Sequence, residues 1–276
     1  MFPGQGSHAG DMCQQVERWC PELGEGASRE LGQDPFQGAA GSTALAQPAI
    51  YCASIAGWRA LAERLQPAAV AGHSLGEFAA LVAAGSLDPL DGLRLVVLRG
   101  RLMQEAQDRQ NGGMIAVSGP SLDRLPRLAE RCGVVVANDN SPSQVVLSGP
   151  TAALKAACEA VKAAGLRAVE LPVGGAFHSP QMSEVRDSFR EAMAEVEIQS
   201  PKLLALCTTT CAPFTKIKDE LADGIVRPVL WRQSVEALCR LGFQRFVEAG
   251  PGRVLSKLVK RTAGDSVDVA MPVDVV

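Results

Sequence analysis

Apolar and polar positions follow a helical period over most of the first quarter of the chain. Residues 8–67 show this pattern, and apolar side chains recur at helical spacing from Ile50 to Leu61. Pro48 suits the first turn of a helix, because its missing N–H would have no intrahelical partner there. We therefore expect this helix to begin near Gln47.

From Gly113 onward the pattern changes to short apolar runs separated by helical stretches. The strand-like runs span 114–117, 134–137, 144–148 and 167–173, and the helical stretches span 121–132 and 151–164. This β-α-β-β-α-β order is that of a ferredoxin-like unit. We predict that residues 113–173 form a small ferredoxin-like subdomain, inserted in a larger α/β body made of residues 1–112 and 174–276. Within the insert, the polar run from Asn138 to Pro142 predicts a loop.

A Gly-x-Ser-x-Gly corner over Val70–Leu81 joins a short apolar run to an Ala/Leu-rich helical pattern. This is the nucleophile-elbow pattern, in which a serine occupies a sharp turn between a strand and a helix. Gly72 and Gly76 lack the Cβ atoms that would clash where the strand and the helix approach. The turn predicts that Ser74 is a nucleophile and that the N–H of Leu75 points toward an oxyanion formed there. A Gly-rich turn without chemistry is the alternative.

Composition narrows the possible classes of protein. The chain has 276 residues, 47 % of them hydrophobic and 21 % charged, which suits a globular protein with a sizeable core. Its net charge of −3 gives no support to a nucleic-acid partner, and no apolar run is long enough to span a bilayer. Nothing at Met1 resembles a signal peptide. We therefore expect a cytoplasmic protein with no membrane partner.

Cysteine and histidine content limits the chemistry further. The eight cysteines contain no C-x-x-C pair, which indicates buried thiols in a reducing compartment, and with only three histidines a metal site is not expected. A serine nucleophile needs a base, most often histidine. His178, in a Gly-rich loop between a strand and a helix, is the preferred candidate. His73 and His8 are alternatives, and a structural role remains open for all three.

Arg99 lies directly after an apolar segment of a predicted helix over 91–106, and Gly100 follows it. Arginines on a helix usually form a solvated face. A buried guanidinium instead needs an anionic partner. Arg99 is therefore a candidate anion-binding residue. No carboxylate stands at a spacing that would complete a Ser-His-acid triad.

Seven motifs follow one another along nearly the whole chain. They are Phe2-Pro3-Gly4-Gln5-Gly6-Ser7, Gln47-Pro48-Ala49, Gly72-His73-Ser74-Leu75-Gly76-Glu77, Arg99-Gly100-Arg101-Leu102-Met103-Gln104-Glu105-Ala106, Asn138-Asp139-Asn140-Ser141-Pro142-Ser143-Gln144-Val145-Val146, Gly175-Ala176-Phe177-His178-Ser179 and Glu248-Ala249-Gly250-Pro251-Gly252. In this order they resemble the malonyl-CoA:acyl-carrier-protein transacylases of fatty-acid and polyketide synthesis. The resemblance implies an α/β fold: a larger α/β-hydrolase-like body with a central parallel sheet, plus the inserted ferredoxin-like subdomain. The family also has a short apolar strand before the motif that begins here at Phe2.

The resemblance implies specific roles for residues of these motifs. Ser74 would be the acylated nucleophile and His178 its general base and acid. Gln5 and the N–H of Leu75 would form the oxyanion hole. Arg99 would bind the free carboxylate of the malonyl group.

Three further expectations come from the same resemblance. Asn140 would line the site. Phe177, together with Leu75, resembles the malonyl-selecting pattern of related polyketide domains. The family orients its histidine with a main-chain carbonyl instead of a carboxylate, and the nearest equivalent here lies around Gly224.

The implied reaction is covalent ping-pong transfer, in which malonyl-CoA acylates the serine and the phosphopantetheine thiol of acyl carrier protein takes the group away. Malonyl-CoA and the carrier are substrates, so no cofactor is expected.

The carrier is expected to be acidic. It could dock on Lys257, Lys260 and Arg261, which could also form a plain solvated face. A serine hydrolase that releases acyl groups from carrier proteins and a non-catalytic interaction subunit are the alternative functions.

Overall fold

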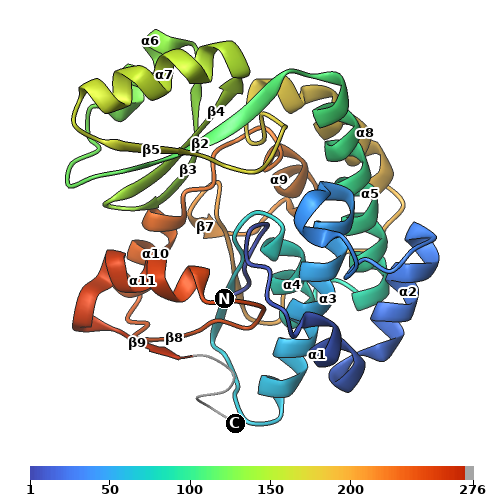
Figure 1. Ribbon diagram of the computed structural model, residues 1–276. Coiled ribbons are helices and arrows are strands. Elements are labelled where there is room, and N and C mark those ends of the chain that lie inside the picture. Colours follow the sequence, from blue (N-terminus) through green and yellow to red (C-terminus); the bar gives the residue numbers. More distant parts are fainter. Residues whose placement is uncertain (271–276) are drawn as a thin grey trace.

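The computed structural model describes residues 1–270, which combine helices with three small sheets in an α/β fold (Figure 1). Residues 271–276, the end of the predicted body, lie outside the described residues. Within residues 1–270, no helix has both the length and the apolar character needed to cross a membrane.

The first part of the chain is helical, as its pattern predicts. Its helices are α1 (Met12–Trp19), α2 (Pro21–Leu31), α3 (Thr43–Ala62), α4 (Gly76–Ala83) and α5 (Pro89–Arg109). The long helices α3 and α5 pack against each other, and α3 is buried along most of its length. These two helices therefore lie at the centre of the largest hydrophobic core.

Helix α3 begins earlier than predicted. It starts at Thr43, so Pro48 lies inside the helix and not in its first turn. Proline has no N–H to bond the carbonyl four residues earlier, which belongs to Ala44. That first turn packs closely on α5, where a Cβ at Gly100 would lie 3.2 Å from the Thr43 carbonyl oxygen. Burial of this turn against α5 outweighs the local preference for a later start.

Short strands bring distant parts of the body together. The strand β1 (Ala69–Ala71) pairs in parallel with β6 (Leu204–Cys207), which pairs antiparallel with β7 (Ala212–Pro213). A separate parallel pair consists of β8 (Arg245–Val247) and β9 (Asp268–Ala270). The predicted central parallel sheet is therefore present as two small pieces, one of which is mixed.

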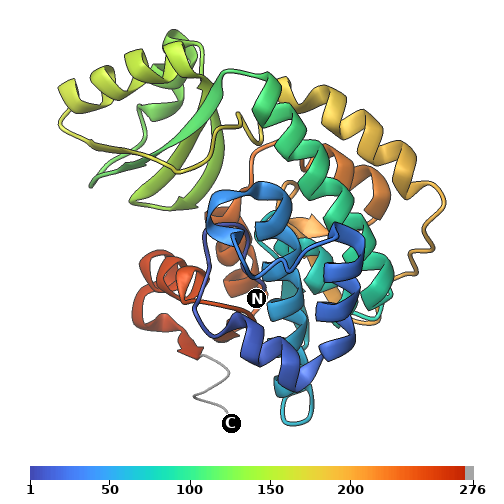
Figure 2. The same cartoon turned by 45° about the vertical axis from the view of Figure 1, so that its right-hand side comes forward.

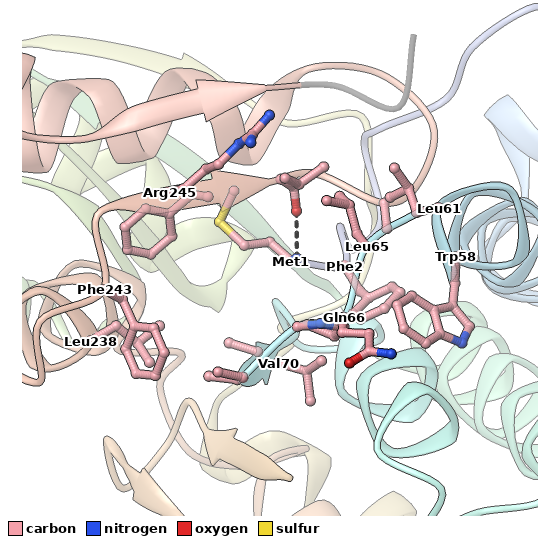
Figure 3. Close-up of a pocket in the computed structure, with 17 residues that line it drawn as sticks. Met1, Phe2, Trp58, Leu61, Leu65, Gln66, Val70, Leu238, Phe243 and Arg245 are labelled. Carbon is pink, nitrogen blue, oxygen red and sulfur yellow. Dashed lines mark hydrogen bonds between the residues drawn. The ribbon is translucent and has the colours of Figure 1, made fainter. Parts of the chain in front are cut away.

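Met1 and Phe2 lie between these two pieces. The Phe2 N–H donates to the Ala71 carbonyl oxygen at 3.0 Å, and the Met1 amine donates to the Val247 carbonyl oxygen at 2.7 Å. Burial lowers the pKa of that amine to about 5. An apolar cavity of about 240 Å³ lies beside them, between β1 and β8, with Trp58 at its edge (Figure 3). Met1 and Phe2 thus make hydrogen bonds like those of a strand, and they fix the start of the loop over residues 3–7.

A four-stranded antiparallel sheet forms the second part of the molecule. Its strands, in the order β3-β4-β2-β5, are β2 (Gly112–Ser118), β3 (Val135–Ser141), β4 (Gln144–Pro150) and β5 (Arg167–Glu170). The helices α6 (Leu125–Cys132) and α7 (Thr151–Ala163) cover the face turned away from the rest of the molecule (Figures 1 and 2). They enclose a hydrophobic core of their own. The order of elements along the chain is the predicted one.

The polar run Asn138–Ser141 is not the predicted loop. The strand β3 continues through it, and only the next two residues turn the chain into β4. Register shifts bend the strand here, and the Asp139 N–H donates to the Val229 carbonyl oxygen of the body at 2.9 Å. The Asp139 carboxylate also accepts hydrogen bonds from both Nε and a terminal nitrogen of Arg232. These long-range bonds outweigh the local turn preference.

Four more helices complete the body: α8 (Ser183–Met193), α9 (Ile217–Asp223), α10 (Trp231–Arg240) and α11 (Val254–Ala263). Helix α8 packs on α5 and α9, while α10 and α11 pack on each other and contact β3. The segment between α9 and α10 therefore passes from the body to the edge of the four-stranded sheet.

Candidate active site

A sharp corner joins β1 to α4, as the sequence predicts. Ser74 has a φ of 52°, in the left-handed region that residues with a side chain rarely adopt. A Cβ on Gly72 would lie 2.0 Å from the Gly76 carbonyl carbon, and a Cβ on Gly76 would lie 2.0 Å from the Phe2 carbonyl oxygen. The two glycines are needed because the strand, the helix and the N-terminal loop meet at this corner.

Ser74 faces His178. The Ser74 Oγ lies 2.9 Å from His178 Nε2, and His178 Nδ1 lies 2.8 Å from the Gly224 carbonyl oxygen and 3.1 Å from that of Arg227. Carbonyl oxygens only accept hydrogen bonds, so Nδ1 carries the proton and Nε2 is free to accept from the Ser74 hydroxyl. The predicted orientation by a carbonyl around Gly224 is confirmed, and Arg227 supplies a second one.

The environment of His178 keeps its imidazole neutral. Burial, with a smaller contribution from the charge of Arg99, lowers the pKa of His178 to about 3. Its φ is 57°, so Ser74 and His178 are two of the three non-glycine residues with positive φ in residues 1–270. Such conformations persist where the surrounding structure enforces them, typically at functional sites. A neutral imidazole beside a hydroxyl is the state that a general base requires.

Arg99 reaches the same hydroxyl from α5. The residue is 3 % exposed, and its two terminal nitrogens donate to Ser74 Oγ at 3.0 Å and to Gln47 Oε1 at 2.7 Å. Burial lowers the pKa of Arg99 only to about 10, so the guanidinium is charged at neutral pH. A planar cation fixed beside the nucleophile suits a carboxylate on a bound molecule.

Gln47 and Glu77 are buried at the site, and no role was predicted for either of them. Gln47 is fully buried in α3, where it accepts from Arg99 and its amide nitrogen lies 3.2 Å from Met103 Sδ. Glu77, on α4, accepts hydrogen bonds from Thr208. A polar side chain within an otherwise apolar helical run was the signal that could have identified both, because such residues are seldom buried without a partner.

The residues expected at the oxyanion hole lie at the same corner. Leu75 directly precedes α4, and within residues 1–270 its N–H has no hydrogen-bond acceptor. The Gln5 side-chain amide donates to Thr43 Oγ1 at 3.1 Å. Its loop lies against the corner, where a Cβ on Gly4 would be 2.5 Å from the His73 carbonyl oxygen. A free N–H at a helix start, next to a nucleophile, is the kind of donor that stabilises an oxyanion.

Asn140 and Phe177 lie beside this group. The Asn140 Oδ1, on the bent part of β3, is 2.9 Å from His73 Nε2, and the His73 ring packs against Trp231 with centroids 5.8 Å apart. Phe177 is buried in the main core next to His178. Among the described residues, the histidine that contacts the Ser74 hydroxyl is His178.

The arrangement has a definite chemical capacity. It offers a hydroxyl nucleophile, a neutral imidazole, a free N–H and a fixed cation within one buried site. Within residues 1–270, no three His, Cys, Asp or Glu side chains are grouped to hold a metal ion. These groups suit transfer of an acyl group onto serine, and the cation suits an acyl group with an acidic end.

Comparisons with known proteins point to the same chemistry. A family model described as an acyl transferase domain matches residues 33–275. The malonyl CoA-acyl carrier protein transacylase of Salmonella typhimurium is 37 % identical over 284 residues, covering 95 % of this chain and 91 % of that protein. An acyl-carrier-protein S-malonyltransferase structure from Burkholderia pseudomallei has a TM-score of 0.90 at 35 % identity, covering 98 % and 94 % of the two chains. A malonyl-transacylase solved with a type II polyketide synthase acyl-carrier protein has a TM-score of 0.89 at 33 % identity, covering 98 % and 93 %.

Proposed function

Since the chain belongs to the acyl transferase family, among the malonyl CoA-acyl carrier protein transacylases, we propose that it transfers the malonyl group from malonyl-CoA to the phosphopantetheine thiol of acyl carrier protein, in fatty-acid or polyketide synthesis. One observation supports this most directly. The Ser74 Oγ lies 2.9 Å from the His178 imidazole and 3.0 Å from the Arg99 guanidinium. A nucleophile, a base and a partner for a carboxylate thus converge on one atom.

The first half of the reaction acylates the serine. His178 Nε2 takes the hydroxyl proton as Ser74 Oγ attacks the thioester carbonyl, and the N–H of Leu75, with Gln5, stabilises the negative oxygen. The carbon–sulfur bond then breaks, and the departing CoA sulfur receives the proton from His178. The Gly224 and Arg227 carbonyls stabilise the transient imidazolium through Nδ1.

The second half returns the group to a thiol. His178 takes the proton of the carrier's phosphopantetheine thiol, and the sulfur of that thiol attacks the carbonyl carbon of the malonyl ester on Ser74. The ester bond breaks, and the serine oxygen regains the proton from His178. Serine, imidazole and amide N–H groups supply every step, so the proposed reaction needs no cofactor.

Selectivity for the malonyl group comes from Arg99. One methylene separates the carboxylate of a malonyl group from its thioester carbonyl, so a short acidic cargo suits a guanidinium 3.0 Å from the nucleophile. An acetyl group would leave this buried cation without a carboxylate, which costs binding free energy. Asn140, which contacts His73, and Phe177, which adjoins His178 in the chain, are proposed to line the acyl-binding space.

We also propose a division of the fold into two parts and a cellular compartment for the protein. The corner at Ser74 supports an α/β-hydrolase-like body of residues 1–112 and 174–276, and the strand order β3-β4-β2-β5 supports a ferredoxin-like subdomain of residues 113–173. All eight cysteines are free thiols, which fits a reducing, cytoplasmic compartment.

Intact-protein mass spectrometry tests the function. Wild type mixed with malonyl-CoA should gain one malonyl group, and Ser74→Ala should gain none. Holo acyl carrier protein added afterwards should remove the group and carry it. Release of free malonate in place of transfer would favour the acyl hydrolase, and a wild type that never forms the ester would favour a non-catalytic interaction subunit.

A further inference from the structure

A salt bridge joins the four-stranded sheet to the body beside the active site. The Asp139 carboxylate, on the bent part of β3, accepts from Arg232 Nε at 3.1 Å and from a terminal nitrogen of Arg232 at 2.8 Å. It also accepts from the Gln233 side-chain amide at 2.8 Å, and both donors stand in the first turn of α10. The Asp139 side chain is 12 % exposed and that of Arg232 is 36 % exposed, so water screens this pair only in part. We call these three side chains the Asp139 clamp.

The segment that enters α10 is held by the same strand. The Val229 N–H donates to the Ala137 carbonyl oxygen at 2.9 Å, and the Val229 carbonyl oxygen accepts from the Asp139 N–H at 2.9 Å. Val229 therefore pairs with β3 in a short parallel bridge. The Asp139 clamp extends this pairing, because it holds the next turn of the chain, at Arg232, against the same strand.

A stiff connection links this pairing to the base. The Arg227 carbonyl oxygen lies 3.1 Å from His178 Nδ1, two residues before Val229. Pro228 stands between them, and its ring fixes φ. Since the adjoining peptide bonds are planar, the Pro228 ψ is the one soft torsion between the Arg227 carbonyl and the Val229 N–H. Placement of Val229 on β3 thus restricts the position of the Arg227 carbonyl oxygen.

The other acceptor on His178 is held by a different element. The Gly224 carbonyl oxygen, 2.8 Å from His178 Nδ1, follows directly after α9. The Gly224 N–H donates to the Glu220 carbonyl oxygen of that helix at 2.9 Å. Loss of the Asp139 clamp would therefore weaken one of the two hydrogen bonds to Nδ1 and leave the other in place.

We propose that Asp139 is a positioning residue: by holding the start of α10 on β3, its carboxylate keeps the Arg227 carbonyl oxygen on His178 Nδ1 and so stabilises the imidazolium that forms during acyl transfer. The inference rests on the proposed transferase function. A hydrogen bond to the charged imidazolium contributes more than the same bond to the neutral ring of the resting enzyme. The Asp139 clamp therefore acts mainly in the transition state, and its effect does not depend on the far end of the acyl group.

Asp139→Ala tests this role, with Asp268→Ala as the matched control, since Asp268 forms an exposed ion pair with Arg245 between β8 and β9. In single-turnover loading followed by intact mass, we expect the maximal rate of Asp139→Ala to fall about tenfold, the size expected when one hydrogen bond to a charged group is weakened. The fall should be equal for malonyl-CoA and acetyl-CoA. The concentration that gives half the maximal rate should stay unchanged, because Arg99 is intact. Asp268→Ala should load like wild type.

Nuclear magnetic resonance measures the hydrogen bond itself. The chain has three histidines, so isotope-labelled histidine gives three imidazole signals, and His178→Gln identifies the one that belongs to His178. A proton in a strong hydrogen bond resonates downfield, and we expect the His178 Nδ1 proton to move upfield in Asp139→Ala. This measurement needs no substrate, so its result is independent of the proposed transferase function.

Variants of Arg232 test the other side of the Asp139 clamp. Arg232→Gln should reproduce the slower loading and the upfield shift. The double variant with Asp139→Ala should be no slower than the slower single variant, because both changes remove the same interaction. Arg232→Lys keeps the charge but loses the planar fork, so it should recover part of the rate. Since Arg232 is partly exposed, its variants keep the test available if Asp139→Ala does not fold.

The outcomes are distinct. A folded Asp139→Ala with an unchanged maximal rate, or with an unchanged His178 proton signal, would overturn the proposal whatever its melting temperature. So would a fully additive loss in the double variant, or the same loss of rate in Asp268→Ala. A wild type that fails to load malonyl at all would instead overturn the proposed function.

Discussion

Replacing Arg99 by alanine removes the buried guanidinium and leaves the nucleophile and base in place. The Ser74 Oγ keeps its 2.9 Å contact with His178 Nε2, so attack on a thioester carbonyl remains chemically available. We expect malonyl loading of Ser74 to collapse, while acetyl loading persists or rises. The reason is that only the malonyl group has a carboxylate that Arg99 can bind, so only malonyl binding loses a contact.

The size of the effect follows from the geometry. Arg99 presents two terminal nitrogens at the site, and each hydrogen bond to a charged partner contributes about 1.5–3 kcal/mol. Loss of two such bonds is about 3–6 kcal/mol. Since about 1.4 kcal/mol corresponds to a factor of ten, malonyl loading should slow by about a hundredfold to ten-thousandfold.

Single-turnover loading measured by intact mass, with malonyl-CoA and acetyl-CoA in parallel, gives the ratio directly. Arg99→Lys is the matched variant: it keeps a charge but loses the planar fork, so it should recover only part of the malonyl rate. Melting temperatures are needed alongside, because Arg99→Ala also removes the hydrogen bond to the buried Gln47 Oε1. Unchanged malonyl loading, or an equal loss of acetyl loading in a folded variant, would refute the carboxylate role.

Other measurements test the remaining parts of the site. Because burial lowers the pKa of His178 to about 3, the acylation rate should not fall near pH 6.5. The unfolded chain protonates the His178 imidazole below about pH 6.5 and the folded chain does not, so the free energy of unfolding should decrease as the pH drops toward 3. A rate that halves near pH 6.5 would contradict this. Gly76→Ala should destabilise the fold by more than about 3 kcal/mol, because the added Cβ would meet the Phe2 carbonyl oxygen. The control Gly10→Ala adds a Cβ in open space and should melt like wild type; equal melting temperatures for the two variants would contradict this explanation. Charge reversal at three basic residues of α11 should raise KM for the carrier protein and leave KM for malonyl-CoA unchanged: Lys257, Lys260 and Arg261. An unchanged KM for the carrier would show that this face of α11 is not the docking surface.

Local sequence was enough where the decisive contacts are close along the chain. The glycines on both sides of Ser74 predicted the corner, because a residue without a Cβ is needed where a strand turns straight into a helix. The apolar neighbours of Arg99 singled it out as a candidate, and in the structure this residue is buried and not part of a solvated face. The element order over residues 113–173 was likewise readable from periodicity.

Local sequence failed where a distant segment changed the outcome. The run Asn138–Ser141 has the composition of a turn, yet it is a strand because Val229 and Arg232 pair with it from the body. Pro48 signals a helix start, yet its helix begins at Thr43 because that turn packs on α5. In both places tertiary hydrogen bonds or burial exceed the small free-energy differences of local preference.

By itself, then, the sequence determined the serine corner, singled out Arg99 as a candidate and gave the alternation of elements, which all depend on neighbours a few positions apart. The sequence favoured His178 as the base and, through the family resemblance, a carbonyl oxygen around Gly224, but only the tertiary structure brought His178 to Ser74, 104 positions away, and added the Arg227 carbonyl oxygen as a second partner. It alone placed Gln47 against Arg99 and Glu77 against Thr208. Such contacts form between separate elements, whose relative placement is set by packing of the whole core and not by any one segment.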